Sequence, residues 1–119
     1  MSRLAMVVED DDGLRMIYRR VLGKMDYEVI EAADGETALQ TIEAITPDIL
    51  FLDIQLPLLN GEAILEYILD APHLQDTYVI IVSSNKQYAV YVKQLPAAEF
   101  VLKPIRPAQI REFASRSLA

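Results

Sequence analysis

Carboxylate, hydroxyl and ammonium groups stand at the ends of four apolar runs in this sequence. Glu9 and Asp10 follow the first of these runs, and Asp53 follows another. Ser83 and Lys103 end two later ones. Neighbouring carboxylates repel one another unless a cation is present, and oxygen ligands without histidine or cysteine favour Mg²⁺ over zinc or copper. If the fold gathers these residues, they predict a magnesium site.

One of the three carboxylates is available as a nucleophile, because Mg²⁺ commonly takes one or two carboxylates together with phosphate oxygens of a substrate. Asp53 is the best candidate for that nucleophile. Phosphoryl transfer also requires groups that neutralise the oxygens of the transferred group. The metal ion, the Lys103 ammonium and the Ser83 hydroxyl could each bind one of these oxygens.

Composition excludes several other classes of protein. The 119 residues are 52% apolar and 24% charged, which is typical of a globular domain, and we expect one domain across residues 1–119. Cysteine is absent and His73 is the only histidine, which excludes disulfides and metal sites built from Cys or His clusters. The net charge of −7 argues against direct binding of nucleic acid. The longest apolar runs fall far short of the ~20 residues that span a bilayer and no signal-peptide pattern opens the chain, so we expect a cytoplasmic protein without membrane contact.

Short apolar runs alternate along the chain with segments of helical periodicity. We expect five strands, at residues 4–8, 27–32, 49–52, 78–82 and 100–102. Apolar residues at helical spacing follow each strand, within residues 14–25, 38–42, 64–69, 88–95 and 110–118. Asp12 and Asp34 are expected to cap the first two helices, and Pro107 to open the last.

Strands that are joined through helices must run parallel, and right-handed crossovers place helices on both faces of the sheet. We therefore predict an α/β fold with a doubly wound, five-stranded parallel sheet. The two most apolar strands, at 4–8 and 49–52, belong in its middle, and the strand with Glu28 and Glu31 at an edge. Ligands of such sheets bind beyond the carboxyl ends of the strands, where the residues singled out above are expected to meet.

Over essentially its whole length the chain resembles the CheY-like receiver domains of bacterial two-component response regulators. Four motifs in the right order carry the resemblance, and they lie at residues 7–10 (VVED), 53–61 (DIQLPLLNG), 82–84 (VSS) and 100–104 (FVLKP). The resemblance implies a flavodoxin-like (βα)5 fold with strand order 2-1-3-4-5. It also implies that Asp53 accepts a phosphoryl group from the phosphohistidine of a histidine kinase or phosphotransfer protein.

The same resemblance implies roles for other residues of the site. Mg²⁺ would be held by Glu9, Asp10, Asp53 and the backbone carbonyl of Gln55. Glu9 stands where the family most often has Asp, and its additional methylene would allow it to hold Mg²⁺ through a water molecule.

On the phosphate side, the resemblance implies that Ser83 and Lys103 grip the phosphoryl group. It further implies that Phe100 is an aromatic switch that rotates inward on activation. From the residues alone, Phe100 is equally compatible with an ordinary core aromatic of an edge strand.

A phosphorylated receiver acts by changing its surface, so the chain is expected to catalyse only its own phosphorylation and dephosphorylation. A downstream protein is expected to bind the face formed by the helix at 88–95, the strand at 100–102 and the helix that Pro107 opens. Homodimerisation on activation is a further expectation of the same kind. The sequence identifies neither the kinase nor the output, and it fits both an independent regulator and one domain of a larger protein.

Two alternative functions use the same residues. In the first, Glu9 and Ser84 have abolished phosphorylation and the chain is a pseudo-receiver that only binds partners; the intact Asp53 and Lys103 argue against this. In the second, Asp53 is the nucleophile of a phosphatase of the haloacid dehalogenase type. Such enzymes need a second Asp as general acid two residues later, where Gln55 cannot transfer a proton. A flavin carrier is excluded because four successive acids at 9–12 would repel its phosphate.

Overall fold

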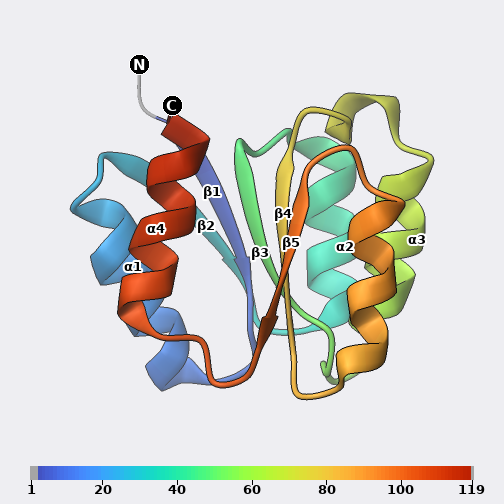
Figure 1. The fold of residues 1–119 in the computed structure, drawn as a ribbon, viewed down its shortest axis with the longest axis horizontal. Coiled ribbons are helices and arrows are strands. Elements are labelled where there is room, and N and C mark those ends of the chain that lie inside the picture. The colour runs from blue at the N-terminus through green and yellow to red at the C-terminus, as the bar shows by residue number, and fades with distance from the viewer. Residues whose placement is uncertain (1–2, 119) are drawn as a thin grey trace.

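Five parallel strands form one sheet in the order β2-β1-β3-β4-β5 in the computed structural model, which describes residues 3–118 (Figure 1). The strand bounds are β1 Arg3–Val8, β2 Tyr27–Ala32, β3 Ile49–Asp53, β4 Tyr78–Ser83 and β5 Ala98–Leu102. The structure confirms the predicted parallel sheet, its strand order and the edge position of β2.

Helices cover both faces of this sheet. Among the residues that the structure describes, four are α-helices, α1 (Asp12–Gly23), α2 (Gly35–Ala44), α3 (Gly61–Leu69) and α4 (Pro107–Leu118), and two are 3₁₀ helices, η1 (Pro72–Leu74) and η2 (Lys86–Lys93). Helices α1 and α4 lie side by side on one face, and α2, α3 and η2 cover the other (Figure 1). No helix within the described residues is long and apolar enough to cross a membrane.

The helical segment between β4 and β5 differs in type from the other long helices. We expected an amphipathic helix at 88–95, and the structure has the 3₁₀ helix η2 at Lys86–Lys93. Aromatic and β-branched residues, which are mediocre α-helix formers, supply half of its eight positions. Tyr91 is buried and Tyr88 packs partly against the core, so the expected inward stripe is present despite the tighter winding.

Strands β1 and β3 lack polar alternation in their sequences because both of their faces are buried. Met6 and Val8 of β1 contribute to the core on the α2 and α3 side, whereas Ala5 and Val7 contribute to the core on the α1 and α4 side. In β3, Phe51 faces the α1 side, where its ring lies 5.0 Å from that of Tyr18. Because helices cover both faces, the positions inside these central strands are apolar, and charged residues occur only at their ends, at Arg3 and Asp53.

Two details of the helices differ from the expectation. Asp11, not Asp12, caps α1: its carboxylate accepts a hydrogen bond from the Leu14 N–H at 2.8 Å. Ile17 is one of the apolar residues at helical spacing within 14–25, a spacing that predicts a buried face, yet it is 39% exposed. The predicted cap of α2 is confirmed, because the Asp34 carboxylate accepts a hydrogen bond from the Thr37 N–H at 2.8 Å.

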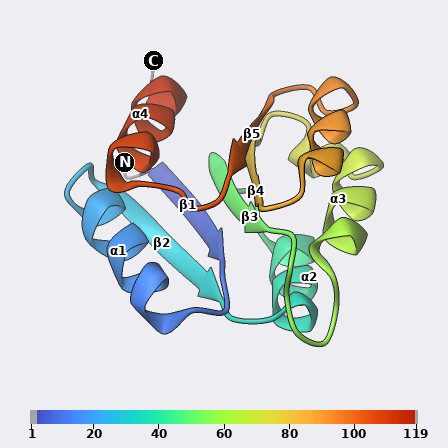
Figure 2. The same cartoon turned by 60° about the horizontal axis from the view of Figure 1, so that its bottom comes forward.

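The carboxyl ends of the strands meet at one edge of the sheet, which Figure 2 brings forward. The strand register pairs Val8 with Leu52, Asp53 with Val82, and Ser83 with Leu102. The residues that end β1, β3, β4 and β5 therefore lie in neighbouring rows at the same edge.

Candidate functional site

Asp53, the last residue of β3, is the centre of the site. Its side chain is only 2% exposed. The oxygen Oδ1 accepts a hydrogen bond from the Gln55 N–H at 3.0 Å and lies 2.9 Å from the Lys103 Nζ. The other oxygen, Oδ2, is buried and has no hydrogen-bond partner among the described residues. A buried carboxylate oxygen without a partner is costly, and such groups commonly mark a site for an ion or a reactant.

Two further carboxylates from the end of β1 complete an acidic cluster. Glu9, Asp10 and Asp53 each offer one oxygen, and these oxygens lie within 4.8 Å of one another. Glu9 is buried, whereas Asp10 is exposed. The prediction that the fold brings these three residues together is confirmed.

The pKa of the Glu9 carboxyl group is perturbed by its place in this acidic cluster. Its pKa is raised from 4.5 to about 7, with burial as the largest cause. The hydrogen bond from the Asp11 N–H lowers this pKa, whereas the negative charge of Asp53 and a hydrogen bond with Asp10 raise it. Within residues 3–118, the positive charge that lowers this pKa comes from Lys103. A divalent cation between the oxygens would remove this repulsion, so the donor set fits the oxygen-only coordination that Mg²⁺ prefers.

Ser83 and Lys103 approach the site from the neighbouring strands. Ser83 is fully buried, and its Oγ accepts a hydrogen bond from the Asn85 N–H at 3.0 Å. The Lys103 N–H donates to the Ser83 carbonyl at 3.0 Å, which ties the end of β5 to the end of β4. The peptide bond between Lys103 and Pro104 is cis. Ser83 lies one residue beyond Val82, the register partner of Asp53.

Gln55 and Ser84 meet on the exposed side of the site. The Ser84 hydroxyl donates to the Gln55 side-chain oxygen at 3.2 Å, and both residues are exposed. The Gln55 N–H is already bonded to Asp53. These contacts place Gln55 directly beside the candidate nucleophile.

Phe100 lies on the edge strand β5, away from the acidic cluster. It pairs in register with Ile81 and is partly buried against the core on the α2 and α3 side. The structure therefore brings five of the predicted site residues together, namely Glu9, Asp10, Asp53, Gln55 and Lys103, and places Ser83 on the adjacent strand. Phe100 is connected to these residues through the pairing of β5 with β4, in which Phe100 lies opposite Ile81.

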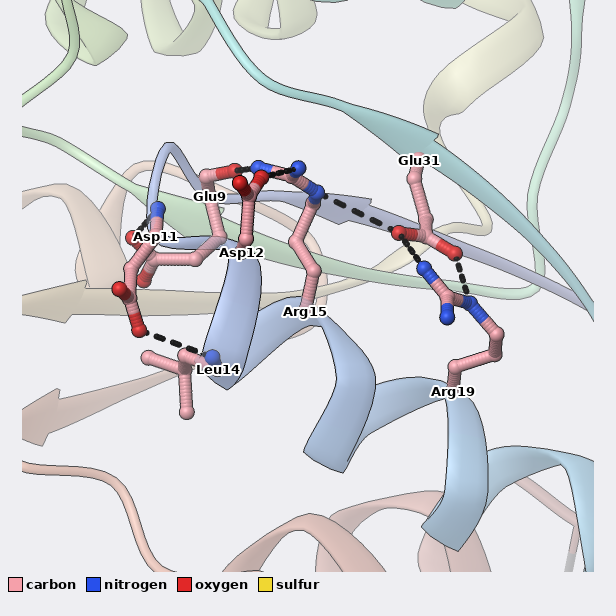
Figure 3. A network of polar contacts seen from close by, with 7 residues as sticks. All are labelled: Glu9, Asp11, Asp12, Leu14, Arg15, Arg19 and Glu31. Atoms are coloured by element: carbon pink, nitrogen blue, oxygen red, sulfur yellow. Dashed lines mark hydrogen bonds and ion pairs between the residues drawn. The ribbon is translucent and has the colours of Figure 1, made fainter.

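Sequence reasoning missed Arg15 of α1. Its Nη1 donates to the Glu9 backbone carbonyl at 2.7 Å, and its side chain is only 15% exposed (Figure 3). No motif drew attention to it, because a basic residue near a helix start is usually solvated. The four successive acids at residues 9–12 were the available sequence signal for a nearby basic residue, because their negative charges require a counter-charge.

Comparison with known proteins identifies the family. Residues 5–115 match the family model described as "Response regulator receiver domain". The chain therefore belongs to the response regulator receiver domains, and the family suggested by the four motifs is confirmed.

Individual relatives agree with this assignment. The chain is 30% identical over 116 residues to the chemotaxis protein CheY of Thermotoga maritima, with 94% of each chain covered. It is 26% identical to the alkaline phosphatase synthesis regulatory protein PhoP of Bacillus subtilis, where 92% of this chain matches 46% of the relative. The chain thus spans almost all of that CheY but less than half of PhoP.

Solved structures share the fold. CheY4 of Vibrio cholerae superimposes with a TM-score of 0.85 at 20% identity, covering 98% of this chain and 99% of the other. The BeF3-activated DrrB receiver domain superimposes with a TM-score of 0.82 at 23% identity, covering 99% and 98%. The sheet and its helices are therefore those of CheY-like receivers.

Proposed function

We propose that this receiver domain, residues 1–119, is a phosphoacceptor switch whose acceptor is Asp53. A carboxylate oxygen of Asp53 attacks the phosphorus of a phosphohistidine in a histidine kinase or phosphotransfer protein. The new O–P bond forms as the N–P bond breaks, and the leaving imidazole nitrogen keeps the electron pair and takes up a proton. The chain changes its own state and turns over no external substrate.

One observation carries this proposal: Asp53 is buried, Lys103 and Gln55 hold one of its oxygens, and the other oxygen has no hydrogen-bond partner within residues 3–118. Fixing Oδ1 orients the carboxylate before the reaction, which lowers the entropic part of the barrier. The free Oδ2 is then available to a cation or to phosphorus. Within residues 3–118 the protein supplies no partner for Oδ2, so a bound cation or a phosphoryl group would have to provide one.

Glu9, Asp10, Asp53 and the Gln55 backbone carbonyl would hold Mg²⁺ in this proposal. The ion would neutralise charge that develops on the phosphoryl oxygens and would offset the repulsion among the carboxylates. Burial of Glu9 and exposure of Asp10 leave one side of the cluster open to solvent. That open side suits an ion that keeps several of its waters.

Ser83 and Lys103 are the proposed partners of the transferred group. The Ser83 oxygen accepts a hydrogen bond from Asn85, which leaves its O–H free to donate to a phosphoryl oxygen. Lys103 is already held at Asp53 by the ion pair and can turn its ammonium to a second oxygen. The new dianion therefore has contacts that the unmodified carboxylate lacks, and such differential contacts are what shift a two-state equilibrium.

The proposed output is a change in the face made by η2, β5 and α4. Val90 of η2 and Leu102 of β5 are 56% and 44% exposed, so this face already offers apolar side chains to a partner or a second copy. Phe100 lies on the same strand as Leu102 and is only partly buried. We propose that it is the aromatic that moves when Ser83 engages the phosphoryl group.

Intact mass measurement tests the proposal. The protein is incubated with Mg²⁺ and acetyl phosphate, beside an Asp53→Asn variant and a sample containing chelator. We expect a gain of one phosphoryl group in the unaltered chain with Mg²⁺, and none in the variant or with chelator. A chain that gains no phosphoryl group at any Mg²⁺ concentration, and binds no beryllofluoride, would contradict the proposal and favour a module that only binds partners.

A further inference from the structure

We propose that Arg15 is a positioning residue for the acidic loop, residues 9–12, and that Mg²⁺ affinity depends on Arg15 although it donates to none of the three cluster carboxylates. The inference rests on the proposed function, because it concerns the same Mg²⁺ site. Figure 3 shows Arg15 between the end of β1, the start of α1 and the side chain of Glu31 on β2.

Three separate elements meet at this one guanidinium. Its Nη1 donates to the Glu9 carbonyl at 2.7 Å, its Nη2 pairs with the Asp12 carboxylate, and its Nε lies 3.4 Å from Glu31 Oε1. A planar group with donors in fixed directions holds its partners in one relative geometry. The contact with the loop is therefore directional as well as electrostatic.

The Glu9 carbonyl needs such a donor. Val8 is the last residue of β1 that pairs with β2 and with β3, so the carbonyl of the next residue lies beyond the sheet ladder. The Glu9 N–H is bonded to the Ala32 carbonyl at 3.0 Å, which fixes the peptide group before Glu9. Arg15 fixes the peptide group after Glu9. Together these bonds set the direction in which the chain leaves β1.

That direction determines where the carboxylates of Glu9 and Asp10 lie. The Asp11 N–H, which follows them, bonds back to Glu9 Oε2 at 3.1 Å and closes the loop on itself. Mg²⁺ requires near-octahedral geometry at short distances. A loop that is free to move would have to become ordered each time Mg²⁺ binds, which weakens binding. Substituting a residue that supports metal ligands commonly lowers metal affinity by about 10-fold or more.

Arg19 provides a matched control, because it belongs to the same network without touching the loop. Its Nε and Nη2 donate to the two oxygens of Glu31 at 2.6 and 2.9 Å. Substituting either arginine removes one positive charge beside Glu31. Only substitution of Arg15 also removes the hydrogen bond to the Glu9 carbonyl.

The sign of the effect separates positioning from simple charge. Arg15 is a cation near a cation site, so removing its charge alone would strengthen Mg²⁺ binding. Losing its positioning of the loop would weaken Mg²⁺ binding. An Arg15→Gln substitution therefore moves the affinity in opposite directions under the two explanations.

Isothermal titration of the unphosphorylated protein with MgCl₂ provides the test, on the unaltered chain, Arg15→Gln and Arg19→Gln. We expect Arg15→Gln to bind Mg²⁺ about 10-fold more weakly, and Arg19→Gln to stay within about 2-fold of the unaltered chain. Thermal unfolding in chelator shows whether each variant is folded. If Arg15→Gln fails to fold, Arg15→Lys replaces it, and we expect weaker Mg²⁺ binding because one ammonium cannot meet three partners.

Normal Mg²⁺ binding by the unaltered chain with equal or tighter binding by the folded Arg15 variant would overturn this inference alone. Failure of the unaltered chain to bind Mg²⁺ would overturn the proposed function and this inference with it. A matching loss of affinity in Arg19→Gln would also overturn the inference, because the loop contact would then not be the cause.

Discussion

Asp53 combines a buried charge with an incomplete set of partners. Lys103 lies 2.9 Å from Oδ1, while Glu9 and Asp10 bring two more carboxylates to the same volume. One ammonium cannot balance three carboxylates. Burial is the largest cause of the raised pKa of Glu9, and the negative charge of Asp53 raises this pKa further. At the scale of residues, the site is therefore prepared for additional positive charge.

Lys103 should stabilise the metal-free protein through Asp53. We expect Lys103→Met to lower the free energy of unfolding by about 1–3 kcal/mol in chelator, because it leaves the buried Asp53 carboxylate without its counter-ion. Urea unfolding measures this loss. Asp53→Asn is the control background, in which the same Lys103→Met change should cost clearly less. An equal loss in both backgrounds would mean that Lys103 acts through its aliphatic packing.

Glu31 should contribute a pH-dependent share of stability. The hydrogen bond from Arg19 is the main reason that its pKa lies below the ordinary 4.5, against the raising effect of burial. A lowered folded-state pKa means that the contribution is present above the unfolded value and is lost as the pH falls through the folded value. We expect Glu31→Gln to be less stable at neutral pH, with the difference narrowing below about pH 4.5. Unfolding curves at several pH values check this, and a constant difference down to pH 2 would contradict it.

At the scale of elements, Gly61, the first residue of α3, lies against the chain that leaves β3. A Cβ at this position would lie 2.7 Å from the Asp53 carbonyl oxygen and 2.7 Å from the Ile54 Cα. The Gly61 N–H also donates to the Ile54 carbonyl at 2.8 Å. Only glycine permits this contact, which sets the position of the chain immediately after the acceptor.

We expect Gly61→Ala to lower the free energy of unfolding by about 1–3 kcal/mol, because backbone atoms must move to admit the methyl group. Gly23→Ala is the matched control at the end of α1, where a Cβ would meet nothing within 4 Å. It should be neutral or stabilising by up to about 1 kcal/mol. Chemical denaturation of the two variants measures both effects, and equal stabilities would contradict the close-contact explanation.

Tyr91 joins η2 to α3. Its hydroxyl lies 2.7 Å from Glu62 Oε2 and 3.0 Å from Glu66 Oε1, and these carboxylates, together with burial, raise its pKa above the ordinary range. We expect Tyr91→Phe to cost about 1–2 kcal/mol of unfolding free energy. Tyr88→Phe, on the same helix, should cost little, because the Tyr88 hydroxyl makes no hydrogen bond within residues 3–118. Hydrogen exchange of η2 should accelerate only in Tyr91→Phe, and equal exchange in the two variants would contradict this role.

The elements also show what the sequence could and could not predict. The strands, their parallel direction and the edge position of β2 follow from apolar runs and helical spacing, which depend on burial, whereas the full strand order came from the resemblance to receiver domains. The cap of α1 was misplaced by one residue because Asp11 and Asp12 are chemically identical, and only the backbone direction selects between them. The acids at residues 9–12 indicate that a counter-charge is needed, but they do not predict the bond from Arg15 to the Glu9 carbonyl, because its acceptor is a backbone atom.

At the scale of the whole molecule, two apolar cores share one sheet. One core lies under α2, α3 and η2, and the other under α1 and α4. The carboxyl ends of the central strands emerge between them, and the acidic cluster lies at that edge. A chemical change at Asp53 is therefore one strand away from β4 and two from β5, whose outer face carries Leu102. In the proposed switch, a shift of β4 and β5 would therefore be enough to carry a change at Asp53 to the exposed surface around Leu102.

Chemical mapping of the phosphoryl group tests the central claim most directly. The protein is treated with Mg²⁺ and acetyl phosphate, reduced with sodium borohydride and digested, and the peptide masses are compared with those of an untreated sample. Borohydride reduces an acyl phosphate to an alcohol, so we expect Asp53, and no other carboxylate, to be converted to homoserine. Conversion at Glu9 or Asp10 in place of Asp53, or a phosphoryl group that resists reduction, would contradict the assignment of Asp53 as the acceptor.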